Sequence, residues 1–452
     1  MVSPATERAP RPRRGQELVL EIESLAHGGR GVARANGYVV FVSGALPGDR
    51  VRARVQKAKR DFGEAQALEL VAPRGDRVAD RCLHGGEPCP GAPWQGLPYE
   101  RQLEEKERQV NDALRRLGGL DGFELEPIEP AVERWRYRNK LEYSFGEGQG
   151  GPALGFHRRG SWAEVVDAED CLLASERNNA ARNEVREWAR REAIPPYDRR
   201  RRAGVLRNLV VREGVRTGQL QTRLITAPAR FAQPPVDLHT VVAGPGGGTQ
   251  GPTGVLGEEF LEETLAGLHL RISAGSFFQP NTPMAERLYA IISDYARPAG
   301  GERVFDLYCG IGTIGITLAP QAGEVWGIEM VPEAIADAKR NAQHNGITNA
   351  TFVASDVRVG VRPLLERAGR PDLVVVDPPR AGLSKKVVRR LVECGPRRIV
   401  YVSCNPTTLA PNASQLAAGG YTLRRVKPVD LFPHTPHVEC VALLERSEGG
   451  ER

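Results

Sequence analysis

The chain has 452 residues, 40% of them hydrophobic, and a formal net charge of +6 at pH 7. This length predicts two or three globular domains, and the lack of an apolar run of about 18 residues argues against a membrane-spanning helix. The Pro- and Arg-rich first 15 residues lack the apolar core of a signal peptide, so we expect a cytoplasmic protein. The positive charge favours a polyanionic partner such as nucleic acid, although a GC-rich genome would produce the same arginine-rich composition.

The N-terminal region is expected to form a basic disordered arm followed by a small β-barrel. Residues 1–14 are rich in arginine and proline and show no apolar periodicity. Residues 15–72 contain five short strand-like runs separated by glycine turns, which is typical of an oligonucleotide-binding barrel. Within them, the stretch GGRGVARANGYVVFVSGALPGDRVRARV resembles a TRAM domain, and this resemblance implies RNA binding.

Three widely separated cysteines, Cys82, Cys89 and Cys171, suggest iron–sulfur ligation in a reducing compartment. Their surroundings resemble a motif that follows TRAM domains in some RNA-modifying enzymes, but Ala92 stands where that motif has a further cysteine. Three alternatives stay open. The site holds a three-cysteine cluster, a cluster with a non-cysteine fourth ligand such as His84, or no cluster at all.

Residues 73–271 are expected to form a mixed central domain. Helical patterns cover residues 99–117 and 176–192, with short strands elsewhere. The segment Arg134–Lys140 alternates aromatic and basic residues, which suits either RNA contacts or an ordinary edge strand. The Gly-, Pro- and Thr-rich stretch Ala243–Gly254 is expected to be a flexible loop.

From residue 272 the sequence alternates strands and helices, which predicts an α/β domain with a Rossmann-like sheet. A strand ending at Tyr308 runs into the GxGxxG turn Gly310–Gly315, and the next strand ends on Glu329. Such a turn with a following acid serves both NAD and S-adenosylmethionine enzymes. Asp356 follows the third strand, where it either contacts an adenine or caps a helix.

Three chemical groups follow the later strands. The apolar run Leu373–Val376 delivers Asp377 and a stiff Pro-Pro-Arg loop, which resembles S-adenosylmethionine-dependent methyltransferases and has no rationale in NAD binding. Cys404 follows another apolar strand and is either a nucleophile or a packed thiol. Glu439 lies on an otherwise apolar strand, where an unpaired acid costs several kcal/mol, so we expect it to have a role.

The ordered motifs FFQPN, DLYCGIG, DPPR, VSCNP and HVECVALL resemble the RNA uracil-5-methyltransferase family, and most of all its 23S ribosomal RNA members. The resemblance extends over nearly the full chain. It implies that the Cys404 thiolate adds to carbon 6 of uracil and that Glu439 removes the proton from carbon 5. It assigns contacts with S-adenosylmethionine or the uracil to Gln279, Tyr308, Thr313, Glu329, Asp356 and Asp377.

Other functions remain to be distinguished. They are a tRNA T-loop uridine methyltransferase, an amino-group methyltransferase that uses the Asp-Pro-Pro motif, and a catalytically silent RNA-binding or ribosome-assembly factor. The sequence implies no protein partner, and we expect a monomer.

Overall fold

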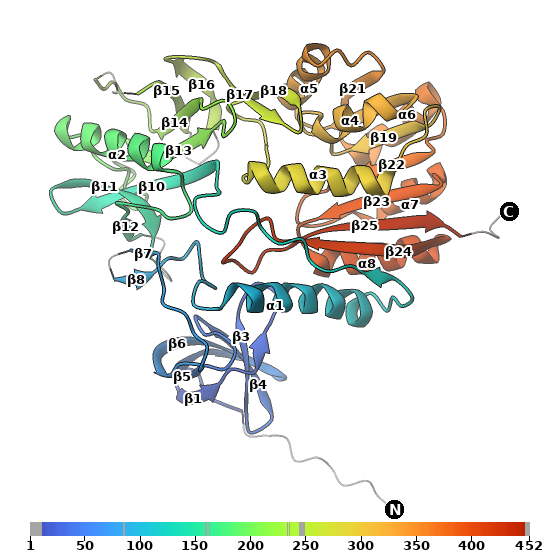
Figure 1. The fold of residues 1–452 in the computed structure, drawn as a ribbon. Helices are drawn as coiled ribbons and strands as arrows, with labels where there is room; N and C mark the ends of the chain where they lie inside the picture. Colours follow the sequence, from blue (N-terminus) through green and yellow to red (C-terminus); the bar gives the residue numbers. More distant parts are fainter. Residues whose placement is uncertain are drawn as a thin grey trace, which may run out of the picture.

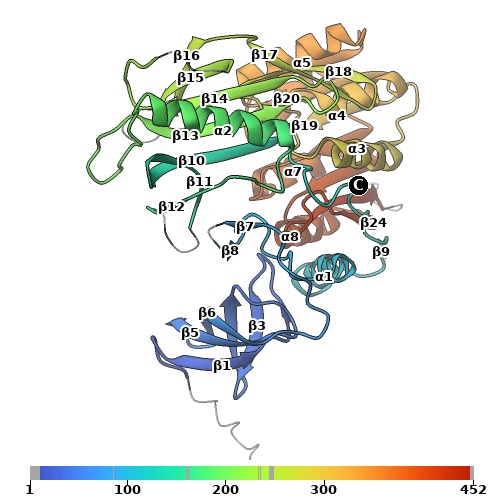
Figure 2. The same cartoon turned by 60° about the vertical axis from the view of Figure 1, so that its left-hand side comes forward.

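The structure is a computed structural model that describes residues 11–84, 86–158, 161, 163–232, 234, 236–243 and 249–447. Most of the arm expected at residues 1–14 lies outside these described residues. A small N-terminal sheet lies at one end of the molecule, with helix α1 (Tyr99–Asp112) between it and two larger bodies (Figure 1). The view of Figure 2 shows the same separation of the small sheet from the rest. Among the described residues, no helix is both long and apolar enough to cross a membrane.

The N-terminal sheet contains six strands in the order β1-β5-β6-β4-β3-β2. Strand β5 places Val51, Ala53 and Val55 in the core and leaves the arginines between them exposed, as alternating side chains in a half-buried strand require. The strands expected in residues 15–72 are therefore present, with one more short strand. Their bounds are β1 Glu17–Glu21, β2 Ser24–Leu25, β3 Gly31–Ala35, β4 Tyr38–Ser43, β5 Arg50–Ala58 and β6 Phe62–Ala72.

The middle of the chain forms a seven-stranded sheet in the order β12-β11-β10-β13-β14-β15-β16, with helix α2 (Glu176–Arg191) packed against it. Two short strands, β7 (Leu83–His84) and β8 (Glu87–Pro88), pair with each other near this sheet. The expectation of a flexible loop over Ala243–Gly254 is wrong for the described part, because β16 pairs antiparallel with β15 there. Proline and glycine are tolerated in such an edge strand. The bounds are β10 Lys140–Gly148, β11 Gly151–His157, β12 Val165–Asp167, β13 Leu206–Glu213, β14 Leu220–Thr226, β15 Leu238–Ala243 and β16 Thr249–Val255.

The C-terminal half is built on an eight-stranded sheet in the order β21-β20-β19-β22-β23-β25-β24-β9. The first five strands are parallel, and β25 runs antiparallel to β23. Strand β22 sends Val374 and Val376 into one buried cluster and Leu373 and Val375 into the other, so both of its faces are covered, as in a doubly wound sheet. The strands are β9 Glu124–Leu125, β19 Arg303–Leu307, β20 Glu324–Glu329, β21 Ala350–Ala354, β22 Leu373–Val376, β23 Arg398–Ser403, β24 Tyr421–Val429 and β25 Glu439–Arg446.

Helices cover the two faces of this sheet. Helices α6, α7 and α8 share one cluster with the π-helix η1 that continues α1, while α3 and α4 share the other cluster with the hairpin of β17 and β18. The remaining bounds are η1 Ala113–Leu117, β17 Phe260–Leu265, β18 Leu268–Ser273, α3 Thr282–Ala296, α4 Thr313–Leu318, η2 Ala319–Gln321, α5 Pro332–His344, α6 Val357–Ala368, α7 Lys385–Cys394 and α8 Pro406–Ala418.

The basic and aromatic segment before β10 is a loop that packs against the C-terminal half, so the edge strand considered there is wrong before Lys140. Trp135 stacks on His434 with ring centroids 4.0 Å apart. Buried Tyr137 donates a hydrogen bond to the backbone oxygen of Pro433 at 3.1 Å. Because Tyr137 is buried, its ring is not free to stack on an RNA base.

A buried ion pair connects α1 to the C-terminal half. The side chains of Lys106 and Asp430 are fully buried and hydrogen-bonded to each other. Tyr99 donates a further hydrogen bond to the Asp430 carboxylate at 2.8 Å, and the Lys106 ammonium also donates to the Phe432 backbone oxygen at 3.0 Å. The pair therefore connects a helix near the N-terminus with the segment that follows β24.

The Lys106→Met variant is expected to lose about 3–5 kcal/mol of stability, because it leaves the Asp430 carboxylate buried without a counter-charge. We expect Lys106→Met combined with Asp430→Asn to recover much of this loss, since no uncompensated charge then remains. Urea denaturation of the wild-type, single and double variants measures the effect. A single variant as stable as the wild type would contradict the importance of this pair.

Candidate active site

The sheet register brings Cys404 and Glu439 together. Antiparallel β23 and β25 pair Ser403 with Cys440 as their last residue pair, so Cys404 and Glu439 are the next residues beyond that pair on the two adjacent segments. Asp377 follows the neighbouring strand β22, and its backbone N–H donates to the Leu307 oxygen at the end of β19, at 3.3 Å. All three groups therefore lie at the carboxyl-end rim of the parallel strands, where open α/β sheets bind ligands.

The local environment alters the proton affinities of these three groups. Desolvation raises the pKa of Glu439 to about 8, with a further contribution from the Asp377 charge. Desolvation also raises the pKa of Asp377 to about 7. Burial, followed by the charges of Glu439 and Asp377, raises the pKa of the Cys404 thiol to about 11, and Arg380 opposes this shift. A carboxyl with a pKa near the working pH is suited to act as a general base.

Cys404 differs from the other six cysteines in exposure. All seven lie in the described residues as free thiols, and Cys404 is half-buried while the others are buried. The next residue, Asn405, caps helix α8 by accepting the Thr407 N–H at 3.0 Å, and its amide donates to the Arg380 backbone oxygen at 3.2 Å. Asn405 therefore ties the cysteine loop to the Asp-Pro-Pro-Arg loop, a positioning contact that the sequence did not indicate.

The glycine turn between β19 and α4 is open on one side. Gly310 and Gly312 have positive φ angles of +52° and +84°, and a Cβ added to Gly310 would meet no atom within 4 Å. Glu329 accepts hydrogen bonds from the N–H groups of Gly310 at 3.3 Å and of Val331 at 3.0 Å. A backbone turn of this kind, beside a carboxylate at the end of the second strand, fits the ribose end of a nucleoside cofactor.

Asp306 is a further candidate site residue that the sequence analysis did not select. It is fully buried on β19, and its Oδ2 accepts the Gly315 N–H at 2.8 Å. Its Oδ1 is buried with no hydrogen-bond partner in the described part of the chain, and desolvation raises its pKa to about 7. A buried acceptor oxygen left unpaired beside the glycine turn is suited to accept a hydrogen bond from a bound ligand. An acid in the apolar strand before the turn was the signal that could have identified it.

The other residues expected to bind the cofactor lie on several different elements. Asp356 caps α6 by accepting the Arg358 backbone N–H at 2.8 Å. Desolvation, and after it the charge of Asp356, raises the pKa of Tyr308 to about 12. The helix-cap role considered for Asp356 is thus present, and its carboxylate lies near Tyr308. Thr313 is the buried first residue of α4, and Gln279 is buried before α3 with its backbone oxygen accepting an Asn139 amide hydrogen bond at 2.9 Å.

Gly312→Ala is expected to destabilise the chain by about 2–4 kcal/mol and to weaken cofactor binding. The new Cβ would lie 3.0 Å from both Ala338 and Phe352, and the positive φ adds backbone strain. Gly346→Ala is the matched control, because its φ is +67° but nothing lies within 4 Å of the added Cβ. Thermal denaturation and cofactor titration of both variants separate the close contact from the strain. Equal losses in the two variants would contradict the role of the contact.

Comparison with known proteins agrees with this geometry. A family model described as tRNA (Uracil-5-)-methyltransferase matches residues 365–447, a TRAM domain model matches residues 11–68, and a methyltransferase domain model matches residues 299–380. An uncharacterized RNA methyltransferase of Halalkalibacterium halodurans is 38% identical, over 94% of this chain and 96% of its own length. Another, from Porphyromonas gingivalis, is 39% identical over 95% of this chain and its full length. The chain belongs to the RNA uracil-5-methyltransferase family.

A solved structure has the same fold as almost all of this chain. The tRNA (uracil-54, C5)-methyltransferase of Pyrococcus abyssi, in complex with S-adenosyl-L-homocysteine, superposes with a TM-score of 0.77. It is 29% identical and covers 94% of this chain and 100% of its own. The protein is therefore an S-adenosylmethionine-dependent RNA methyltransferase of the uracil-5 family with an RNA-binding TRAM domain. Neither NAD nor a silent RNA-binding role accounts for these matches.

In this methyltransferase, the loop between β24 and β25 contacts the TRAM sheet and leads to the carboxyl-end rim of the parallel strands. A Cβ added to Gly29, in the turn before β3, would lie 2.9 Å from Pro436. The Trp94 backbone N–H donates to the His434 backbone oxygen, in the same loop, at 2.9 Å. Because this loop leads directly into Glu439, the RNA-binding sheet and the candidate base share a structural connection.

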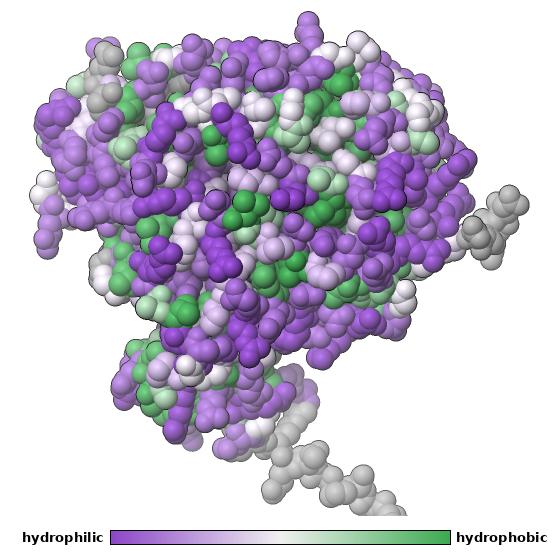
Figure 3. All heavy atoms as spheres, in the orientation of Figure 1, coloured by the Kyte–Doolittle hydropathy of each residue, from purple (hydrophilic) through white to green (hydrophobic). Residues whose placement is uncertain are grey.

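The face shown in Figure 3 is mainly hydrophilic, with apolar residues in small separate groups.

Proposed function

We propose that this enzyme methylates carbon 5 of a specific uridine in 23S ribosomal RNA, as a cytoplasmic monomer. The observation that carries the proposal is that a half-buried thiol, Cys404, and a buried carboxyl, Glu439, both lie next to the last residue pair of β23 and β25, close enough for the Glu439 charge to raise the pKa of the thiol. An amino-group methyltransferase has no use for such a pair. The basic TRAM domain and the long similarity to RNA methyltransferases support RNA as the substrate.

Carbon 5 of uracil is a weak nucleophile, and the role of Cys404 is to activate it. The Cys404 thiol first loses its proton to solvent; the sulfur then forms a bond to carbon 6, and the electron pair of the carbon 5–carbon 6 π bond moves toward carbon 5 and the O4 oxygen. Bound S-adenosylmethionine supplies an electrophilic methyl group. The residues suited to hold it are Gln279, Tyr308, Thr313, Glu329 and Asp356, together with Asp306 and its unpaired Oδ1.

Resolution of the adduct requires a base. After methylation, carbon 5 carries both a methyl group and a proton, and Glu439 removes that proton. The released electron pair re-forms the carbon 5–carbon 6 double bond and expels the Cys404 sulfur. The pKa of about 8 places Glu439 close to the working pH, and Asp377, which follows β22 on the other side of β23, is suited to hold the uracil edge.

A second candidate substrate is tRNA. The resemblance to 23S ribosomal RNA enzymes favours ribosomal RNA, whereas the solved Pyrococcus abyssi relative is named as a tRNA uracil-54 enzyme. In either substrate the uridine has to leave its stack to reach the rim of the sheet.

The test is methyl transfer from labelled S-adenosylmethionine to 23S ribosomal RNA and to tRNA, each free of the modification, followed by fragment mapping. We expect label in 5-methyluridine of 23S fragments. Label confined to tRNA would replace the first substrate with the second, and label on an amino group or on no RNA would overturn the proposed reaction.

A further inference from the structure

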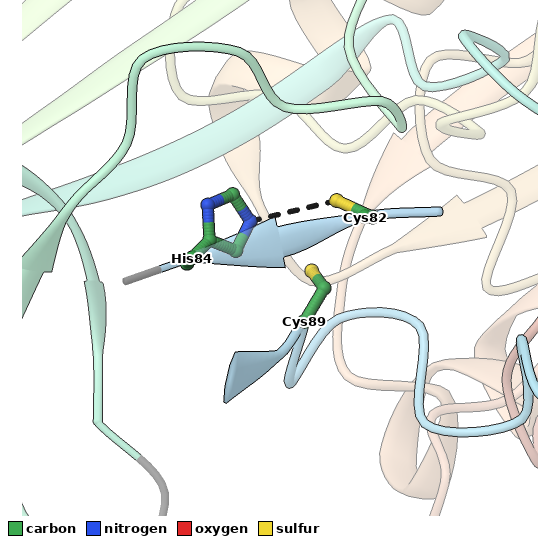
Figure 4. Close-up of side chains that lie close together, drawn as sticks. All are labelled: Cys82, His84 and Cys89. Atoms are coloured by element: carbon green, nitrogen blue, oxygen red, sulfur yellow. Dashed lines mark hydrogen bonds between the residues drawn. The ribbon is translucent and has the colours of Figure 1, made fainter. Parts of the chain in front are cut away.

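A group of buried metal-binding side chains lies away from the catalytic rim. Cys82, His84 and Cys89 come from the β7–β8 hairpin and its end, and all three are buried. Figure 4 shows the His84 ring and both sulfur atoms directed into one common space. Nothing in the methylation mechanism uses these residues.

Their spacing matches one ion rather than a cluster. The ligand atoms of the three residues lie within 4.8 Å of one another, and Cys82 Sγ is 3.5 Å from His84 Nε2. Around a tetrahedral zinc ion, with Zn–S of about 2.3 Å and Zn–N of about 2.0–2.1 Å, such a pair would be about 3.6 Å apart. In a four-iron cluster each thiolate binds a different iron, so the ligand atoms lie farther apart.

Cys171 lies in the same buried cluster as Cys82 and Cys89, and its sulfur is not one of the three ligand atoms that lie within 4.8 Å of one another. Its backbone is fixed by Asn179, which accepts the Cys171 N–H at 2.9 Å and donates to the Cys171 oxygen at 3.1 Å. The loop that contains Cys171 and Leu173 also approaches the segment after the hairpin. A Cβ added to Gly91 would lie 3.2 Å from Leu173 and 3.6 Å from Cys89 Sγ, so Leu173 and the Cys89 sulfur both lie beside Gly91. Cys171 is fully buried in the cluster of side chains that also contains Cys82 and Cys89.

The backbone holds the two hairpin thiols in fixed positions. Gln95 accepts the Cys82 N–H at 2.8 Å and donates to the Cys82 oxygen at 2.9 Å, and the Cys89 N–H donates to the same Cys82 oxygen at 3.0 Å. Such supporting contacts are typical of built metal sites. Ala92, where the iron–sulfur motif has its further cysteine, is completely buried and offers no ligand atom. A four-thiolate iron–sulfur cluster therefore does not fit these residues.

We propose that Cys82, His84, Cys89 and Cys171 bind a single zinc ion in a tetrahedral site with three sulfur ligands and one nitrogen. Four protein ligands leave no open position, so the site is structural. It links the hairpin before α1 to the loop before α2, and so fixes the connection between the TRAM domain and the central sheet.

The first test uses the full-length protein purified without oxygen from cells supplied with both iron and zinc. Elemental analysis is expected to give one zinc per chain without stoichiometric inorganic sulfide, and zinc X-ray absorption to show three sulfur ligands and one nitrogen. Stoichiometric iron with sulfide would overturn the proposal. Failure to retain any metal, also after incubation with zinc under reducing conditions, would overturn it equally.

Variants test the ligand set independently of methyl transfer. His84→Cys is expected to keep one zinc and to change its coordination to four sulfur ligands. His84→Ala is expected to lose zinc to a chelator at least about tenfold faster than the wild type, and Leu83→Ala, at an exposed neighbouring position, is the control. Unchanged coordination in His84→Cys would exclude His84 as a ligand and overturn the proposal.

Discussion

The Cys404→Ala variant is expected to lower kcat for RNA methylation by at least about 10⁴-fold, because removing the nucleophile of a covalent mechanism leaves only binding and orientation. Affinities for RNA and for S-adenosylmethionine should change by less than about threefold, since Cys404 is a small half-buried side chain beside the site. Single-turnover kinetics and equilibrium binding measure the two effects separately.

The control for this variant is Cys394→Ala. Cys394 is a buried thiol at the end of α7 and has no place in the proposed chemistry. We expect it to lose some stability, of the order of 1 kcal/mol, and to keep its activity. Comparable loss of methylation in both variants would point to a folding defect, and full activity of Cys404→Ala would refute the nucleophile assignment.

The Glu439→Gln variant is expected to stop the reaction after methyl transfer. Glutamine keeps the shape of the side chain but cannot take up the carbon 5 proton, so steady-state turnover should fall by about 10²–10⁴-fold. A protein–RNA adduct that survives denaturing electrophoresis should accumulate in the presence of S-adenosylmethionine. Rapid turnover without adduct would show that another group is the base.

The Glu439→Gln substitution is also expected to change how stability depends on pH. Most acids in folded proteins lower stability as pH falls, whereas Glu439 is expected to lower it as pH rises. Burial raises the folded-state pKa of Glu439 to about 8, above the value of about 4.3 for an unfolded chain. The folded protein therefore holds a proton that the unfolded chain releases, and stability falls as pH rises from about 4 to about 8. At pH 8 the Glu439→Gln variant should be more stable by roughly 1–3 kcal/mol, with a difference that vanishes near pH 4. Thermal denaturation across this pH range would detect it, and a lower melting temperature at pH 8 would contradict the buried-acid account.

The sequence predicted the elements of the site better than their arrangement. The apolar run before Cys404 indicated a strand, and the acid on the last apolar strand indicated a role for Glu439. Their proximity depends on the antiparallel pairing of β23 with β25, a long-range contact that periodicity does not specify. Asp306 was missed for a similar reason. Only the structure shows that its Oδ2 accepts the Gly315 N–H while its Oδ1 has no hydrogen-bond partner among the described residues.

Local composition misled the sequence analysis where tertiary contacts dominate. The stretch that contains β16 looked like a flexible loop because of its glycines and proline, yet it pairs with β15 at a sheet edge. The aromatic residues before β10 looked available for RNA, but Trp135 stacks on His434 and Tyr137 is buried. In the cysteine motif, sequence alone showed that a ligand was missing at Ala92, and only the structure shows how close His84 lies to Cys82.

The most direct test of the covalent mechanism uses substrate RNA in which the target uridine is replaced by 5-fluorouridine. Fluorine cannot leave carbon 5 as a proton, so methylation should leave the RNA attached to the enzyme. We expect a stoichiometric complex that requires S-adenosylmethionine, with mass spectrometry locating the adduct on the peptide that contains Cys404. Efficient methylation of normal RNA with no trapped complex, or an adduct on a different residue, would contradict the account.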